Sequence, residues 1–240
     1  MKILSIGNSF SQDAHRYLHA VAAERGKEIT TVNLYIGGCS LERHYNNLIE
    51  DIAAYDYEYN GEKTDRRISV TEALASDDWD VVTLQQVSSK SFDISTYSPY
   101  LEALAARVRE ICPEAALLMH ATWAYEDGSE RLATLGYGCA EDMLRDAREA
   151  YDAAARLISA DGIIPSGETM MEALCLGIGK VHRDTFHASL GAGRYLLALV
   201  WYGYLTGGDV AEDRFASLDE PITEDERRII IDAVRRVLGR

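Results

Sequence analysis

The chain has 240 residues, 47% of them hydrophobic, and a formal net charge of −15 at pH 7. This length and hydrophobic content allow one α/β domain with a full core, so a single domain over residues 1–240 is expected. The negative charge argues against nucleic acid and anionic membrane as partners, because both repel an acidic surface.

The cysteines are far apart and form neither a C-x-x-C pair nor a Cys/His ligand spacing; they are Cys39, Cys112, Cys139 and Cys175. We expect them to be reduced, and we expect no metal site. The N-terminus shows no basic segment followed by an apolar run, and no apolar stretch is long enough to span a bilayer. The sequence therefore predicts a cytoplasmic protein, or a secreted one if a leader has been removed.

Residues 2–6 alternate β-favouring apolar side chains, which predicts a short buried strand. A Gly-Asn pair then suits a tight turn, and a helix is expected over 13–25. This order places Ser9 at the C-terminal edge of a strand, where open α/β sheets bind ligands. The alternative is an ordinary polar turn in which Ser11 or Asp13 caps the helix.

Strands and helices alternate along the rest of the chain. Further strands are expected at 28–35, 79–84, 115–121 and 162–165, and helices at 41–49, 70–75, 97–112, 140–160, 167–174, 190–205 and 224–238. Alternating tyrosines before Asn60-Gly61 predict a small β-hairpin excursion from the main sheet near residues 55–68. The pattern predicts a three-layer α/β/α sandwich with a flavodoxin-like parallel sheet of about five strands, in the order 2-1-3-4-5.

Asp184 and His187 lie three residues apart on a loop near the end of the chain. There the carboxylate could accept a hydrogen bond from His187 Nδ1, leaving Nε2 free toward Ser9 as the base that a serine nucleophile needs. Parallel strands end on one rim, so the fold could bring the early serine and the late pair together. The alternative is that Asp184 caps a turn and His187 starts the next helix.

Two other loops are expected on the same rim. Gly37 and Gly38 could offer unobstructed backbone N–H groups for an oxyanion hole, and the carboxamides of Gln85 and Gln86 could donate to the same oxygen. Taken singly, the glycines are equally explained by a turn and the glutamines by a solvated loop.

Together these pieces resemble the SGNH (GDSL-like) hydrolase superfamily. The matching blocks are Gly7-Asn8-Ser9-Phe10, Gly38, and Asp184-Thr185-Phe186-His187 with Ala188-Ser189-Leu190 after it, so the resemblance spans almost the whole chain in short blocks. It implies that Ser9 is the nucleophile, His187 the base and Asp184 its orienting partner. It also implies an oxyanion hole that includes the N–H groups of Ser9 and Gly38.

The chain departs from the superfamily in the third block, which indicates a divergent branch. Where the family carries Gly-x-Asn, whose asparagine completes the oxyanion hole, this chain has Gln85-Gln86-Val87-Ser88-Ser89. Gln86 is the expected substitute, with Gln85 and Ser89 behind it. The departure affects the strength of the hole, because losing one donor typically costs about 2.7–4 kcal/mol of transition-state stabilisation.

Weaker candidates for substrate contacts are Asn8, Gln85, His120 and Trp123. His120 is expected at the rim beside Trp123 and Tyr125, and a satisfied core histidine is an equal alternative. His15 and His19 are one helical turn apart, but no third ligand is implied, so they are expected to be surface or packing residues.

The resemblance implies a carboxylic-ester hydrolase that forms an acyl-enzyme and needs no cofactor. The expected substrates are small acyl esters, above all O-acetylated carbohydrates. The alternatives are a non-catalytic carbohydrate- or ligand-binding protein on the same fold, which the altered third block would fit, and a lipid-acyl or thioester hydrolase, which would need a long apolar groove.

Overall fold

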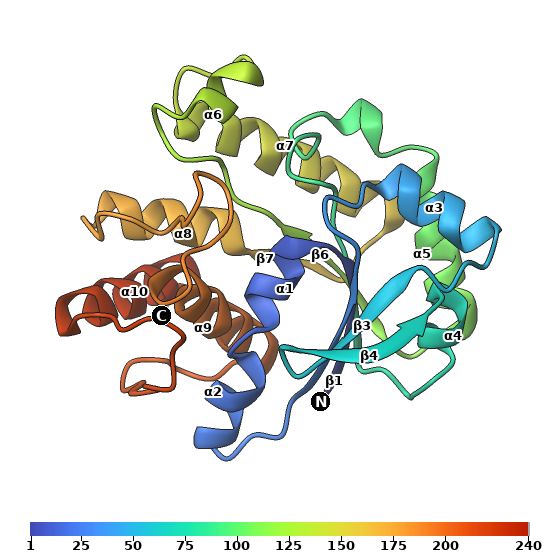
Figure 1. The fold of residues 1–240 in the computed structure, drawn as a ribbon, viewed down its shortest axis with the longest axis horizontal. Helices are drawn as coiled ribbons and strands as arrows, with labels where there is room; N and C mark the ends of the chain where they lie inside the picture. The colour runs from blue at the N-terminus through green and yellow to red at the C-terminus, as the bar shows by residue number, and fades with distance from the viewer. Residues whose placement is uncertain (240) are drawn as a thin grey trace.

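The computed structural model describes residues 1–239, which form one mixed β-sheet between two layers of helices (Figure 1). The strands are β1 (Lys2–Gly7), β2 (Thr30–Tyr35), β3 (Tyr55–Tyr59), β4 (Glu62–Ile68), β5 (Val81–Leu84), β6 (Ala116–Ala121) and β7 (Gly162–Pro165). Their order is β4-β3-β2-β1-β5-β6-β7. The five neighbouring strands β2, β1, β5, β6 and β7 pair in parallel, so their C-terminal ends lie at the same edge of the sheet.

The predicted hairpin exists, but it belongs to the main sheet. β3 pairs antiparallel with β2, from Val32 opposite Tyr59 to Tyr35 opposite Asp56. The expected count of five strands and the order 2-1-3-4-5 are therefore wrong for the sheet as a whole, since the hairpin adds two strands beyond β2, of which β4 is at the edge. The five parallel strands keep that relative order within it. A β-bulge between Asp56 and Glu58 shifts the register of the hairpin.

The helices cover both faces of the sheet (Figure 1). On one face lie α1 (Ser9–His15), α2 (Leu18–Glu24), α8 (Ser166–Cys175), α9 (Ala192–Thr206) and α10 (Glu224–Val237), and on the other α3 (Leu41–Ile49), α4 (Val70–Leu74), α5 (Tyr100–Ile111) and α7 (Ala140–Ile158). The short α6 (Glu130–Thr134) follows β6 and was not predicted. Side chains alternate across β1, so that Ile3 joins one core and Leu4 the other.

The helix expected over 13–25 begins earlier and is broken. α1 starts at Ser9, ends at His15, and is followed by α2 from Leu18. Its N-cap is Asn8, so the alternative in which Ser11 or Asp13 caps the helix is wrong; asparagine is as good a cap as either residue. Among residues 1–239, no helix combines the length and apolar character needed to cross a bilayer.

Among the buried histidines, three have a strongly lowered pKa and are neutral in the folded protein. Burial lowers the pKa of His15, His44 and His120 to about 3. In an unfolded chain each would titrate near its ordinary pKa of about 6.5, so the unfolded state binds more protons below that pH. The folded state should therefore lose stability as the pH falls below about 6.5.

We expect the free energy of unfolding to fall by up to about 1.4 kcal/mol per pH unit for each of these histidines between about pH 6 and pH 4.5. Urea unfolding across this range measures the slope. In the variant His44→Gln, the free energy of unfolding should depend less steeply on pH, by the contribution of one histidine. An unchanged slope would show that His44 is not neutral in the folded protein.

Candidate active site

Ser9 follows the end of β1 directly, at a tight strand-to-helix turn. Asn8 Oδ1 accepts a hydrogen bond from Phe10 N at 3.0 Å, and Asn8 N donates to Ser11 Oγ at 3.0 Å. A β-carbon at Gly7 would lie 2.0 Å from Ser11 Oγ, so the turn closes only around glycine. The serine is 9% exposed, which leaves a small reactive surface on a fixed backbone.

Ser9, His187 and Asp184 form one hydrogen-bonded chain. Ser9 Oγ lies 2.8 Å from His187 Nε2, and His187 Nδ1 lies 2.7 Å from Asp184 Oδ2. Asp184 Oδ1 also accepts a hydrogen bond from the backbone N–H of His187 at 2.9 Å, which holds the carboxylate next to the imidazole ring. With Nδ1 donating to the carboxylate, Nε2 is free to accept the serine proton.

The Asp184 carboxyl is ionised near neutral pH. Partial burial raises its pKa, but the hydrogen bonds donated by the His187 ring and backbone outweigh this, so that the pKa is lowered overall. A carboxylate in this position holds the imidazole in one tautomer and stabilises the imidazolium that forms when the serine loses its proton.

The loop that carries this pair is held from the β6 side. Trp123 Nε1 donates to Phe186 O at 2.7 Å, and Glu126 N donates to Thr185 O at 2.7 Å. The Trp123 ring is buried and stacks on Phe10 at 4.1 Å between centroids. Trp123 was a weak candidate for substrate contact; its contacts make it a support for the loop.

The two backbone N–H groups expected in an oxyanion hole, those of Ser9 and Gly38, follow the ends of β1 and β2. Ser9 N belongs to the first turn of α1, where no helical acceptor exists, and Gly38 follows β2 with φ of +61°. In the part of the chain from residue 1 to residue 239, neither N–H has a hydrogen-bond partner. Nothing lies within 4 Å of a β-carbon built at Gly38, so the backbone angle, and not space, calls for glycine there.

The contacts of Gln86 do not support the role expected for it in the oxyanion hole. Its Oε1 accepts from Leu41 N at 3.0 Å and from Val87 N at 2.9 Å. Its Nε2 donates to the backbone oxygen of Thr96 at 3.0 Å and to Thr96 Oγ1 at 3.1 Å. Both carboxamide hydrogens are thus used, and the fully buried side chain ties the loops after β2 and β5 together. Ser89 is exposed on the loop after β5.

Gln85, His120 and Asn8 form a buried polar network beneath the serine turn. Gln85 Nε2 donates to Asn8 Oδ1 at 2.8 Å, and Gln85 Oε1 lies 2.8 Å from His120 Nδ1. His120 Nε2 lies 3.0 Å from Ser166 Oγ, which accepts from Trp201 Nε1 at 3.2 Å. Because Asn8 Oδ1 accepts from the backbone of α1, it must also accept from Gln85. Each group of the network then donates to the next one toward Asn8, from Trp201 through Ser166 and His120 to Gln85.

This network corrects three predicted substrate contacts. Asn8, Gln85 and His120 are all buried and hydrogen-bonded to one another, so they support the turn and do not face an open site. For His120 the core alternative is the right one. The sequence did carry a signal for Asn8, because Asn8 and Ser11 have the spacing of a capping box.

His15 and His19 do not meet at a common site. His15 Nε2 lies 2.9 Å from Ser5 Oγ in the core, and His19 Nδ1 lies 2.6 Å from Ile29 O. Over residues 1–239, no three side chains of histidine, cysteine, aspartate or glutamate are arranged to hold a metal ion.

Several solved structures resemble this one. A crystal structure of a DUF4886 family protein from Bacteroides uniformis is 34% identical in sequence, with a TM-score of 0.92, and the match covers 100% of this chain and 95% of that chain. A member of the lipolytic protein G-D-S-L family from Veillonella parvula is 14% identical, with a TM-score of 0.55 and coverage of 86% and 98%. A family 3 carbohydrate esterase from Clostridium thermocellum is 12% identical, with a TM-score of 0.55 and coverage of 84% and 93%.

At such low identities the last two likenesses show a shared fold, which is the α/β fold of GDSL-like hydrolases. No match was found among curated proteins. A family model described as a domain of unknown function (DUF4886) matches residues 2–228, most of the chain. The chain therefore belongs to the DUF4886 family.

Proposed function

We propose that the protein is a serine hydrolase that cleaves small acyl esters through an acyl-enzyme. The observation that carries the proposal is the chain of hydrogen bonds from Ser9 Oγ to His187 at 2.8 Å and from His187 to Asp184 at 2.7 Å. A serine, an imidazole and an ionised carboxylate in this geometry are the parts that activate a hydroxyl for attack on a carbonyl. The shared fold with GDSL-family lipases and esterases supports the same reaction class.

In the proposed reaction, Ser9 Oγ attacks the ester carbonyl while His187 Nε2 takes its proton. The N–H groups of Ser9 and Gly38 stabilise the negative oxygen of the tetrahedral intermediate. His187 then gives the proton to the departing alcohol, which leaves an acyl group on Ser9. A water molecule, deprotonated by His187, attacks this acyl group and releases the acid.

An open cavity beside the catalytic loop carries hydrogen-bonding side chains on its wall, which supports a polar alcohol such as a sugar. It has a volume of about 560 Å³, is open to solvent, and is lined by Ser89, Tyr125, Arg131 and Thr185 among others. Thr185 is part of the loop that carries His187. Hydroxyl groups and a guanidinium offer hydrogen bonds to sugar oxygens, so we propose O-acetylated carbohydrates as the substrate class.

A second cavity bears on the alternative of a lipid-acyl or thioester hydrolase, because its wall combines apolar side chains with charged ones such as Glu141 and Lys180. It has a volume of about 520 Å³ and is lined by Trp123, Met170, Met171 and Leu174 among others. Ser9 and His187 are not among the lining residues, and the connection to the serine turn is through Trp123, which stacks on Phe10. A panel of acyl esters of graded chain length, with acetylated sugars included, distinguishes the two substrate classes.

A non-catalytic carbohydrate- or ligand-binding protein is the second candidate, because Gln86 does not supply the side-chain donor that the third block was expected to provide. We expect Ser9→Ala to lower kcat for p-nitrophenyl acetate by roughly 10⁴- to 10⁶-fold, since the nucleophile is lost. Ser217→Ala, at an exposed serine, is the matched control and should keep the wild-type rate. Equal rates for wild type and Ser9→Ala would leave the binding function as the better explanation.

Gly38→Ala tests the proposed oxyanion hole. Alanine fits the space but strains the left-handed backbone, so the N–H should turn away and kcat should fall by roughly 10²- to 10³-fold with little change in KM. Gly26→Ala is a matched control, because Gly26 has φ of +66° and equally open surroundings. Both variants should lose similar stability, measured by thermal unfolding. If the two also lost kcat equally, Gly38 would have no special role.

A further inference from the structure

Asp13 is a buried carboxylate on the helix that begins with Ser9. It is 0% exposed, and it lies four residues after the serine in α1. Residues four apart lie one above the other on the same side of an α-helix. The side of α1 that presents the hydroxyl therefore also presents a negative charge, one turn further along.

Every group that Asp13 accepts from belongs to the C-terminal part of the chain. Arg183 Nη1 lies 2.9 Å from Oδ1 and 3.0 Å from Oδ2, and Arg194 Nε lies 2.8 Å from Oδ1. The backbone N–H of Ala188 donates to Oδ2 at 3.1 Å. A buried carboxylate costs much free energy unless it is paired and hydrogen-bonded, and here two guanidinium groups and one backbone N–H provide that pairing.

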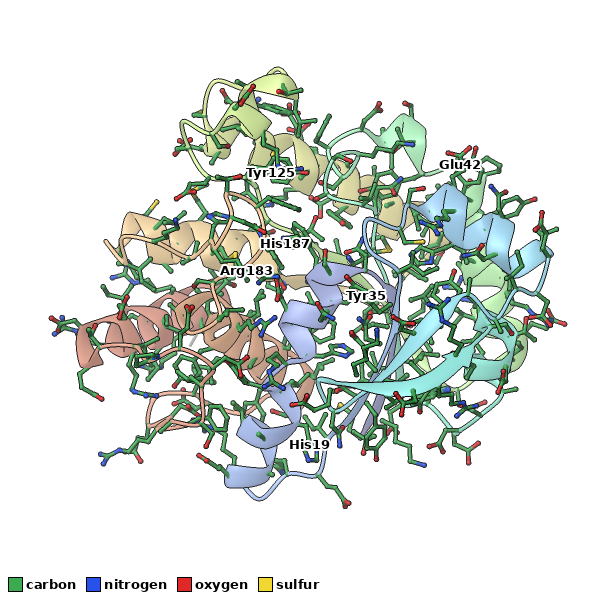
Figure 2. The ribbon with its side chains drawn as sticks, in the orientation of Figure 1. His19, Tyr35, Glu42, Tyr125, Arg183 and His187 are labelled. Carbon is green, nitrogen blue, oxygen red and sulfur yellow. The ribbon has the colours of Figure 1, made fainter. Side chains whose placement is uncertain are left out.

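Two of these donors flank the His187–Asp184 pair. Arg183 directly precedes Asp184, and Ala188 directly follows His187. Arg183 Nη1 also donates to Ala188 O, and Arg183 N donates to His187 O at 3.0 Å, so the two ends of the loop 183–188 are closed on each other. Figure 2 shows Arg183 and His187 next to one another beside α1.

The connection from Ser9 to His187 is consequently short and stiff. It runs along one helical turn to Asp13, then through one hydrogen bond to Ala188, which is the residue bonded to His187. The loop cannot leave α1 without leaving a buried carboxylate short of its partners, which is strongly unfavourable. On this side of the loop, the pairing of Asp13 is the link between the helix that carries Ser9 and the loop that carries His187, and Ser9 Oγ and His187 Nε2 lie 2.8 Å apart.

We propose that Asp13 is a positioning residue for the hydrolysis proposed above. It touches no reacting atom. Its pairing with Arg183 and Ala188 holds the base loop on the nucleophile helix and keeps the imidazole within hydrogen-bond distance of the serine. The proposal rests on the proposed function, because a positioned base matters only if Ser9 is a nucleophile.

The chain offers a matched buried pair that lies apart from the catalytic loop. Asp213 is 5% exposed, lies 2.7 Å from Arg25 Nε, and accepts from the backbone N–H of Phe215 and the hydroxyl of Tyr195. None of these partners belongs to the loop 183–188. Asp213→Asn and Asp13→Asn thus each remove one buried carboxylate charge, but only Asp13→Asn affects the link to His187.

We expect Asp13→Asn to lower kcat for p-nitrophenyl acetate by about 100-fold with KM nearly unchanged, which is the effect of a displacement of about 1 Å at a reacting group. Asp213→Asn should keep the wild-type kcat at a temperature where both variants are folded, although both have a lower Tm. A loss of kcat that merely follows the unfolded fraction, equal in the two variants, would overturn the proposal.

A second pair keeps the test decisive if Asp13→Asn does not fold. Arg183→Met removes the bridge but leaves Asp13 its bonds to Arg194 and Ala188, and Arg25→Met is its control. Arg183→Met should lose kcat, and Arg183→Lys should recover part of it because the charge returns without the double contact. Equal kcat in Arg183→Met and Arg25→Met would contradict the role of Asp13.

The rate at which a fluorophosphonate labels Ser9 separates this proposal from the proposed function. A wild-type protein whose Ser9 is not labelled, and which hydrolyses no ester, refutes the proposed function. A labelled wild type with an unreactive Ser9→Ala and a fully reactive Asp13→Asn refutes the positioning role alone. We expect labelling of Asp13→Asn to be slowed in step with its kcat.

Discussion

The side chain of Asn8 holds together the loops at the C-terminal ends of the parallel strands. Its Oδ1 accepts from the first turn of α1 and from Gln85 Nε2 at 2.8 Å, and its Nδ2 donates to Cys39 O at 3.1 Å. One carboxamide thus joins the segments that follow β1, β2 and β5. Because Gly38 and Ser9 flank two of these contacts, the two N–H groups of the proposed oxyanion hole depend on the Asn8 side chain for their relative placement.

Around this turn, charge and polarity are distributed in two ways. Beneath it lies a neutral network that runs through Gln85 and His120, and burial keeps that histidine uncharged by lowering its pKa to about 3. Beside it lies the ionic pairing of Asp13 with Arg183 and Arg194. The neutral network holds the backbone turn that carries Ser9, and the ion pairs hold the loop that carries His187. Buried polar groups of this kind specify one arrangement strongly, since each unmade bond is costly.

The parts of the fold that depend on local chemistry could be predicted from the sequence. The helix Leu41–Ile49 with its Ser40 cap and the strand Gly162–Pro165 agree with the expected ranges, because their signals lie within a few residues. The hairpin was recognisable from Asn60-Gly61, but its pairing with β2 is a contact between distant segments. Spacing and resemblance predicted that Ser9, His187 and Asp184 lie together, and the structure places them in one hydrogen-bonded chain. The contacts of Gln86 could not be predicted, because its bonds to Leu41 and Thr96 exist only in the folded chain. The same holds for Asp13, whose position in the sequence resembles that of an ordinary cap.

The distance along the chain between the two ends of the triad has a consequence for biosynthesis. Ser9 and His187 are 178 residues apart, and the arginines that pair with Asp13 are equally late. During translation, Ser9 and Asp13 are synthesised early. The arginines that pair with Asp13 are added only near the end. Closing so long a loop carries an entropic cost that only the docking of the last helices repays. The hydrogen-bonded chain from Ser9 to Asp184 can therefore form only late in folding, once the C-terminal segments that carry His187 and the two arginines are present.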